Sequence, residues 1–235
     1  RPDVVLRISS AGHEIASHGQ DHRRADEQSV AEFRDDVAAA KHTLEDLIGR
    51  EVLGYRAPSY SLTSKMTAHF DALAETGYAY DSSIYPARPI HRRYGDLNAV
   101  TTSHYIHPNI YEFPLPTLKL GRRRVPAATG AYLRLLPYGV TRWAINQNLQ
   151  RNTSAVINIH PWEFDPDQPR VDVALRTRTR HGGGQGSMAN KLLKLVENYR
   201  SVSLVDMLPG SRVVNRDTAS TAIPSRSHLE CESRT

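Results

Sequence analysis

Cysteine is almost absent from this chain, since Cys231 is the single one among 235 residues. A disulfide framework and a cysteine-rich zinc module are therefore excluded, and a metal site would have to use carboxylates and the eleven histidines. No stretch approaches the roughly 18 consecutive apolar residues of a membrane-spanning helix, and the mean hydropathy is -0.51. No basic segment followed by an apolar run resembles a secretory signal, so we expect a cytoplasmic protein without a transmembrane segment.

Charge of one sign is only slightly in excess. Thirty Lys and Arg residues against twenty-five Asp and Glu residues give a formal net charge of +5. This excess is dilute and no recognised nucleic-acid motif accompanies it, so we expect no nucleic-acid partner. The basic run 122–124 is interpreted as solvated surface, with an acidic polysaccharide as the partner of interest.

Helical and strand-like segments alternate along the first part of the chain. The clearest helix begins after Ser29, where Ser29 and Glu32 have the spacing of a capping box, and ends at Gly49. The apolar patterns predict helices over 3–11, 29–49, 64–76, 137–150 and 187–199, and strands over 13–18, 52–55, 78–80, 111–113, 117–120, 155–159 and 202–205. This alternation indicates an α/β fold in which helices cover a parallel sheet.

Three regions lack a regular pattern. Residues 84–130 hold six prolines and are interpreted as an irregular insertion. Residues 176–186 combine alternating arginines with a glycine triplet, which is typical of a mobile surface loop. Residues 209–235 contain no aromatic residue and are rich in Ser, Thr and Arg, which is typical of a disordered tail. We therefore expect one domain over residues 1–208.

Two histidines stand four positions apart, directly after the strand predicted at 13–18. On a helical or tightly turned backbone, His18 and His22 would point their imidazoles the same way, which is how one metal ion takes two nitrogen ligands. The alternative is an ordinary polar loop with titrating histidines. His13 would face the opposite side of the strand and is left out of the predicted metal site.

Three further polar segments follow predicted strands, at the edge where α/β folds place their sites. They are residues 56–60, 81–86 and 160–163. A buried Arg56 before a proline needs a carboxylate partner, and His160 at a strand end can shuttle a proton. Each also has a structural alternative: a salt bridge for Arg56, a turn cap for Asp81 and a backbone-bonded core histidine for His160.

Taken together, these segments resemble the polysaccharide deacetylases of the NodB-homology type, carbohydrate esterase family four. The resemblance covers about residues 1–208 and rests on three segments: the histidine motif at 12–22, the arginine-proline motif at 56–60 and the strand-histidine motif at 157–160. It is closest to the subgroup associated with exosortase and exopolysaccharide gene clusters, which is suggested by residues 80–86, 134–138 and 160–163.

The resemblance implies a role for each matching residue. His18 and His22 would be two ligands of a divalent metal, for which zinc is expected. Arg56 would orient the catalytic carboxylate, and His160 would be the general acid that protonates the leaving amine. The rim or support of the sugar pocket is assigned to Tyr60, Asp81 and Trp162. The implied reaction is metal-dependent hydrolysis of the acetamide of N-acetylated sugars in a polysaccharide, in exopolysaccharide biosynthesis.

The chain departs from the family pattern near its start. The resemblance implies two aspartates on an early strand, one as base and one as metal ligand, and nothing before His13 supplies them. We therefore expect a distorted (β/α) barrel that lacks its first strand or strands, in a fragment that binds metal poorly and has little or no turnover. The alternatives are a degenerate protein and a non-catalytic polysaccharide-binding protein whose aromatic side chains stack on sugar rings.

Overall fold

The computed structural model of the chain describes residues 1–87, 95–127, 129–151, 154–165, 167 and 183–211. Its α-helices are α1 (Pro2–Ser10), α2 (Val30–Ile48), α3 (Thr67–Glu75), α4 (Gly130–Leu135), α5 (Tyr138–Leu149) and α7 (Met188–Asn198). The strands are β1 (Gly54–Tyr55), β2 (Tyr80–Asp81), β3 (His104–His107), β4 (Ile110–Glu112), β5 (Thr117–Leu120) and β6 (Arg123–Pro126). Short 3-10 turns cover Ala25–Glu27, Pro58–Tyr60, Pro161–Phe164, Gln185–Ser187 and Val205–Met207.

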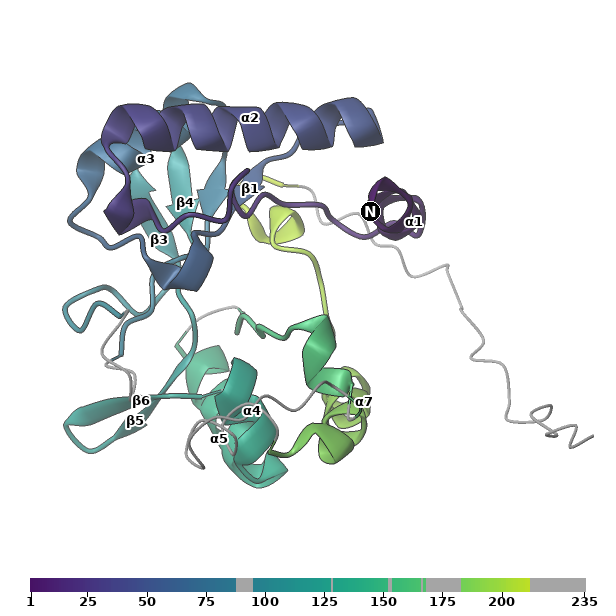
Figure 1. Cartoon of the computed structure of the whole chain (residues 1–235). Coiled ribbons are helices and arrows are strands. Elements are labelled where there is room, and N and C mark those ends of the chain that lie inside the picture. The colour runs from purple at the N-terminus through teal and green to yellow at the C-terminus, as the bar shows by residue number, and fades with distance from the viewer. Residues whose placement is uncertain (88–94, 128, 152–153, 166, 168–182, 212–235) are drawn as a thin grey trace, which may run out of the picture.

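A four-stranded sheet with α2 and α3 packed on it forms one half of the molecule (Figure 1). The strand order is β1-β2-β4-β3, and β1, β2 and β4 are parallel whereas β3 runs antiparallel to β4. Helix α2 begins with the predicted capping box, in which Ser29 and Glu32 satisfy each other's backbone N–H groups. Its apolar face buries Phe33 and Val37 in the largest core cluster, together with Tyr55 from β1.

The second half consists of the β5–β6 hairpin and the helices α4, α5 and α7 (Figure 1). Asn148 of α5 ties this hairpin down, because its side-chain amide donates to the carbonyl oxygen of Thr117 at 2.9 Å. Lys191 of α7 donates to the carbonyl oxygens of Leu133 and Leu136 at 3.0 and 2.8 Å. Its ammonium group therefore satisfies carbonyls at the end of α4 that have no partner inside that helix.

Parallel pairing brings several strand ends to one edge of the sheet. Ser17 forms an isolated parallel bridge with Tyr55, so His18 and Arg56 leave the sheet side by side. Asn158 forms a second parallel bridge with Thr129, two residues before His160. Segments far apart in the sequence thus place polar side chains where open α/β sheets bind their ligands.

The helices predicted from the sequence are confirmed to within a few residues, but several strands are not. The strands predicted at 13–18 and 155–159 are reduced to the two isolated bridges. The strand predicted at 202–205 is wrong, because this segment leads into a 3-10 turn instead. The insertion predicted at 84–130 is not irregular throughout, since it contains β3 and the β5–β6 hairpin.

Two predictions lie largely outside the described residues. They are the mobile loop at 176–186 and the tail at 209–235. Within the part of the chain that the structure describes, the strands form two separate sheets and do not close into the predicted barrel. In the same part, no helix has both the length and the apolar character needed to cross a membrane.

Candidate functional site

A cavity of about 290 Å³ lies at the carboxyl ends of the parallel segments. The side chains of chemical interest in its lining are His18, Arg56, Ser82, Asn158 and His160. Three of the residues predicted from the sequence are thus brought together, namely His18, Arg56 and His160. The other four, His22, Tyr60, Asp81 and Trp162, do not line this cavity.

His18 is held by a bond from its ring to the main chain of the next motif. Its Nδ1 atom lies 2.6 Å from the carbonyl oxygen of Arg56. Because a carbonyl oxygen only accepts, Nδ1 carries the hydrogen, and Nε2 is the nitrogen with a free lone pair in the neutral ring. The ring of His22 lies edge-on to that of His18, with 5.0 Å between the ring centroids.

The surroundings of His18 favour its neutral form. Solvent reaches the residue, but partial loss of hydration lowers the pKa of the imidazole, and the nearby charges of His22, Arg56 and His160 lower it further. The bond to the Arg56 carbonyl acts in the opposite direction and is a weaker influence on this pKa than the loss of hydration. A neutral imidazole is the form that binds a metal ion.

A carboxylate of α2 holds the loop between the two histidines through hydrogen bonds. Asp36 accepts the backbone N–H groups of Gln20 and Asp21 at 3.1 and 2.9 Å. This residue was not identified from the sequence, although it lies on the buried face of α2 between Phe33 and Val37. A carboxylate on an otherwise apolar helix face is the signal that could have found it, because a buried charge needs partners.

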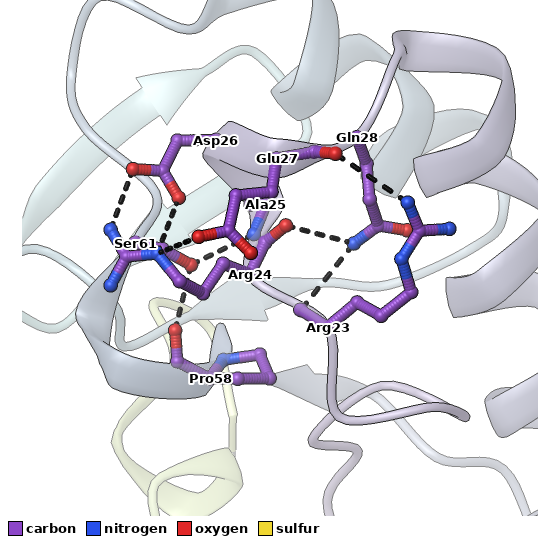
Figure 2. A network of polar contacts seen from close by, with 8 residues as sticks. All are labelled: Arg23, Arg24, Ala25, Asp26, Glu27, Gln28, Pro58 and Ser61. Atoms are coloured by element: carbon purple, nitrogen blue, oxygen red, sulfur yellow. Dashed lines mark hydrogen bonds and ion pairs between the residues drawn. The ribbon is translucent and has the colours of Figure 1, made fainter.

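A second set of hydrogen bonds joins the loop after His22 to the arginine-proline motif. Ser61 accepts the backbone N–H of Ala25 at 2.8 Å and donates to the carbonyl oxygen of Pro58 at 2.7 Å (Figure 2). The neighbouring ion pair of Arg24 with Asp26, at 2.6 Å, holds the same turn from outside (Figure 2). The hydrogen bond between Ala25 and Ser61 therefore joins the two motif loops, and the ion pair stabilises the first of them.

Backbone strain is concentrated in the same two loops. Among the described non-glycine residues, positive φ angles occur at His22, Ser59 and Tyr60, with values of 53°, 58° and 53°. Such angles are sparsely populated for L-residues and tend to gather at functional sites. Tyr60 uses this conformation to pack its ring 5.4 Å from that of Tyr85, edge to face.

The guanidinium of Arg56 joins three separate segments. Its Nε and Nη2 atoms donate to the carbonyl oxygen and the hydroxyl of Ser82, both at 2.8 Å. Its Nη1 atom donates to the side-chain oxygen of Asn158, also at 2.8 Å. These partners of Arg56 are all neutral oxygens. The salt bridge considered as the structural alternative for Arg56 is therefore not formed among the described residues.

Asp81 is completely buried and bonded to the main chain beside the site. Its carboxylate accepts the hydroxyl and the backbone N–H of Ser83 at 2.6 and 3.0 Å. Across the sheet it is the register partner of Glu112, which is also completely buried. Burial raises the pKa of Asp81, and burial together with the charge of Asp81 raises that of Glu112 well above its ordinary range. Asp81 therefore stabilises the backbone next to the cavity, and its buried side chain cannot contact a sugar.

His160 lies at the start of the turn Pro161–Phe164, with half of its side chain exposed. The ring of Trp162 stacks on it, with the centroids 5.8 Å apart and the planes 29° apart. Glu163 accepts the backbone N–H of His160 at 3.2 Å and forms an ion pair with the buried Arg134 at 3.1 Å. The ring of Trp162 is thus engaged with His160, and Trp162 itself does not line the cavity.

A metal ion at this site would take two of its donors from the histidine pair. A zinc-ligating histidine usually donates its second ring N–H to a carbonyl or carboxylate, as His18 does, and this leaves Nε2 for the metal. In the described part of the chain, no group of three or more His, Cys, Asp and Glu residues is suited to hold a metal ion. His18 and His22 would therefore need donors from beyond the described residues.

Two known families match the chain, one in each of two successive segments, and both segments contribute residues to the cavity. Residues 1–80 match the polysaccharide deacetylase family, which is a family of hydrolases. Residues 82–209 match the domain of unknown function DUF3473, and because this match covers more than half of the chain, the chain belongs to that family. His18 and Arg56 lie in the first segment, whereas Ser82, Asn158 and His160 lie in the second.

One solved structure is similar to this chain at the level of the fold. A crystal structure assigned as a polysaccharide deacetylase from Mycobacterium smegmatis superposes with a TM-score of 0.51 at 16% sequence identity, covering 84% of this chain and 60% of that one. Another from Pseudomonas aeruginosa PAO1 gives a TM-score of 0.48 at 15% identity, covering 86% and 59% of the two chains. The chain thus spans about three fifths of the length of these structures. No curated protein matches the sequence significantly.

Proposed function

We propose that this protein hydrolyses the acetamide group of N-acetylated sugars in a polysaccharide, with a divalent metal such as zinc, in the synthesis of an exopolysaccharide. The observation that carries the proposal is the convergence of His18, Arg56 and His160 on one cavity at the carboxyl ends of parallel segments. The match of residues 1–80 to a hydrolase family that acts on polysaccharides supports the same chemistry.

Each residue of the site has a defined task in this reaction. Hydrolysis adds water to the acetyl carbon, breaks the carbon–nitrogen bond and leaves acetate and an amine that takes up a proton. His18 and His22 would hold the metal, which supplies polarisation of the carbonyl and activation of water when bound. His160 is half exposed beside the cavity and would deliver the proton to the amine.

The remaining predicted residues would support the cavity. Arg56 fixes the relative positions of Ser82 and Asn158 and would orient the catalytic carboxylate, which would come from beyond the described residues. Tyr60 would contribute to the sugar-binding rim from its strained loop. Asp81 and Trp162 would act as supports, Asp81 below the sheet edge and Trp162 behind His160.

The test is release of acetate from N-acetylated oligosaccharides, measured with and without a metal chelator. We expect release that depends on the metal and is lost in the His160→Ala variant. Glycan binding that is indifferent to chelator, without any acetate release, would instead identify a non-catalytic polysaccharide-binding protein.

A further inference from the structure

A buried ion pair stands behind the proposed general acid. The side chains of Arg134 on α4 and Glu163 in the turn Pro161–Phe164 are both completely buried, and Nη1 of Arg134 lies 3.1 Å from Oε1 of Glu163. Removing two charges from water is costly and such pairs contribute little to stability on balance. A fully buried pair next to a half-exposed histidine therefore calls for a function other than stability.

Both members of the pair are bonded to the backbone around it. Oε2 of Glu163 accepts the backbone N–H of His160 at 3.2 Å, and the backbone N–H of Glu163 donates to the His160 carbonyl oxygen at 3.0 Å. Nε of Arg134 donates to the carbonyl oxygen of Gly183 at 2.6 Å. The turn that begins at His160 is thus closed by Glu163, and Glu163 is fixed in turn by Arg134.

Trp162 extends this control from the backbone to the side chain of His160. Its ring stacks on the imidazole, and the guanidinium carbon of Arg134 lies 4.9 Å from its centroid. Cation–π contact holds the indole in place, and the indole restricts the rotamers of the imidazole. Nδ1 of His160 is also 3.9 Å from Oε1 of Glu163, within range of an ion pair when the imidazole is protonated.

We propose that Arg134, Trp162 and Glu163 are positioning residues that hold His160 in the one orientation that faces the cavity. The inference rests on the proposed role of His160 as proton donor. A half-exposed histidine on a free turn would populate several rotamers, and a displacement of about 1 Å costs on the order of a hundredfold in rate. The cluster removes this freedom before the substrate binds.

The test compares two nearly isosteric variants of the same turn. Glu163→Gln keeps one oxygen for Arg134 but replaces the other acceptor with an amide that cannot accept the His160 N–H. Asp165→Asn, two residues further on and exposed, is the matched control. The ring protons of His160, assigned by their absence in His160→Ala, report by NMR whether the imidazole still stacks on Trp162.

We expect the His160 ring protons to move toward the positions of an unstacked histidine in Glu163→Gln and to stay in place in Asp165→Asn. For acetate release we expect kcat to fall roughly tenfold or more with KM nearly unchanged. Glu163→Gln should add nothing in the His160→Ala background, because the cluster acts through His160.

A second pair of variants covers the case in which Glu163→Gln does not fold. Trp162→Phe keeps an aromatic face for His160 and should retain most of kcat, whereas Trp162→Leu should lose it. Unchanged His160 resonances and unchanged kcat in folded Glu163→Gln and Trp162→Leu would overturn the inference and leave the proposed function intact. Displaced resonances in a protein that releases no acetate would overturn the proposed function and leave the positioning of His160 standing.

Discussion

Nδ1 of His18 lies 2.6 Å from the carbonyl oxygen of Arg56, and this contact makes one unit of two motifs that stand 38 positions apart. The parallel bridge between Ser17 and Tyr55 brings the two residues side by side, and Ser61 links the loops that follow them. The backbone of Arg56 therefore sets the orientation of His18, the first proposed metal ligand. Changes in either loop are expected to affect both.

Zinc binding should depend on both histidines of this unit. In the 235-residue chain we expect weak binding, and either His18→Ala or His22→Ala should reduce the affinity at least about tenfold, because each removes a donor atom. Calorimetric titration with zinc measures this change. His42→Ala, which removes an exposed histidine of α2, is the control and should leave the affinity as it is. Equal affinity in all three variants would exclude the histidine pair as the metal site.

Asp36 should matter for stability as well as for the loop that carries the histidines. Asn at this position retains one acceptor oxygen, so one of the two backbone N–H groups of Gln20 and Asp21 loses its partner. We expect Asp36→Asn to lower the free energy of unfolding by about 1–3 kcal/mol and to weaken zinc binding. Chemical denaturation and zinc titration measure the two effects. Asp35→Asn alters the exposed neighbour on the same helix. An equal loss of unfolding free energy in that variant would argue against a specific role of Asp36 in holding the loop.

Gly19 should tolerate a side chain less well than Gly49. Both glycines have positive φ angles, 80° and 67°, so alanine at either position carries the strain of the left-handed region, about 1–2 kcal/mol. A Cβ atom at Gly19 would also lie 2.7 Å from Oδ2 of Asp36, whereas nothing lies within 4 Å of one at Gly49. Gly19→Ala should therefore destabilise the fold more than Gly49→Ala, as measured by thermal unfolding. The reverse order would show that the loop yields freely around Asp36.

The Asp81–Glu112 pair should make stability fall as the pH rises. The pKa of Glu112 is raised in the folded state, so above the ordinary value of 4.5 the folded chain holds a proton that the unfolded chain releases. Stability from this group is therefore complete below that pH and is lost as the pH rises through the higher folded pKa. Glu112→Gln should flatten the decline in unfolding free energy with rising pH. Glu197→Gln on the exposed surface of α7 should leave it unchanged, and a decline that persists in Glu112→Gln would assign it to another group.

The sequence predicts the helices well and the strands less well, for a physical reason. The capping box of Ser29 and Glu32 and the periodicity of α2 are local signals, which hold whatever the rest of the chain does. A strand exists only through its partner, and among the described residues the segments around Ser17 and Asn158 each find a partner at one position only. The strands and turns within 104–126 also depend on the pairing of neighbouring strands. The many prolines of this region hide the strand pattern in the sequence.

Three site residues, His18, Arg56 and His160, could be predicted because strand ends and motif spacing are visible in the sequence. Their supports could not be predicted in the same way. Asp36, Ser61 and Glu163 act through backbone N–H groups and carbonyl oxygens. Of the three, only Asp36 has a signal in the sequence, as a carboxylate on an otherwise apolar helix face. The sequence assigns Trp162 to the rim or support of the sugar pocket, but its place beside Arg134 depends on a contact between residues 28 positions apart.

The bond from Arg56 to Asn158 joins residues 102 positions apart, and it crosses from one matched family segment to the other. Closing so long a loop is entropically costly, so we expect the cavity to form late in folding, after the local helices and hairpins. For the same reason we expect it to be among the first features lost when the protein opens locally. Ligand binding in this cavity therefore reports the integrity of the whole chain, because a molecule that has opened only between its halves retains α2 and α5 but has no site.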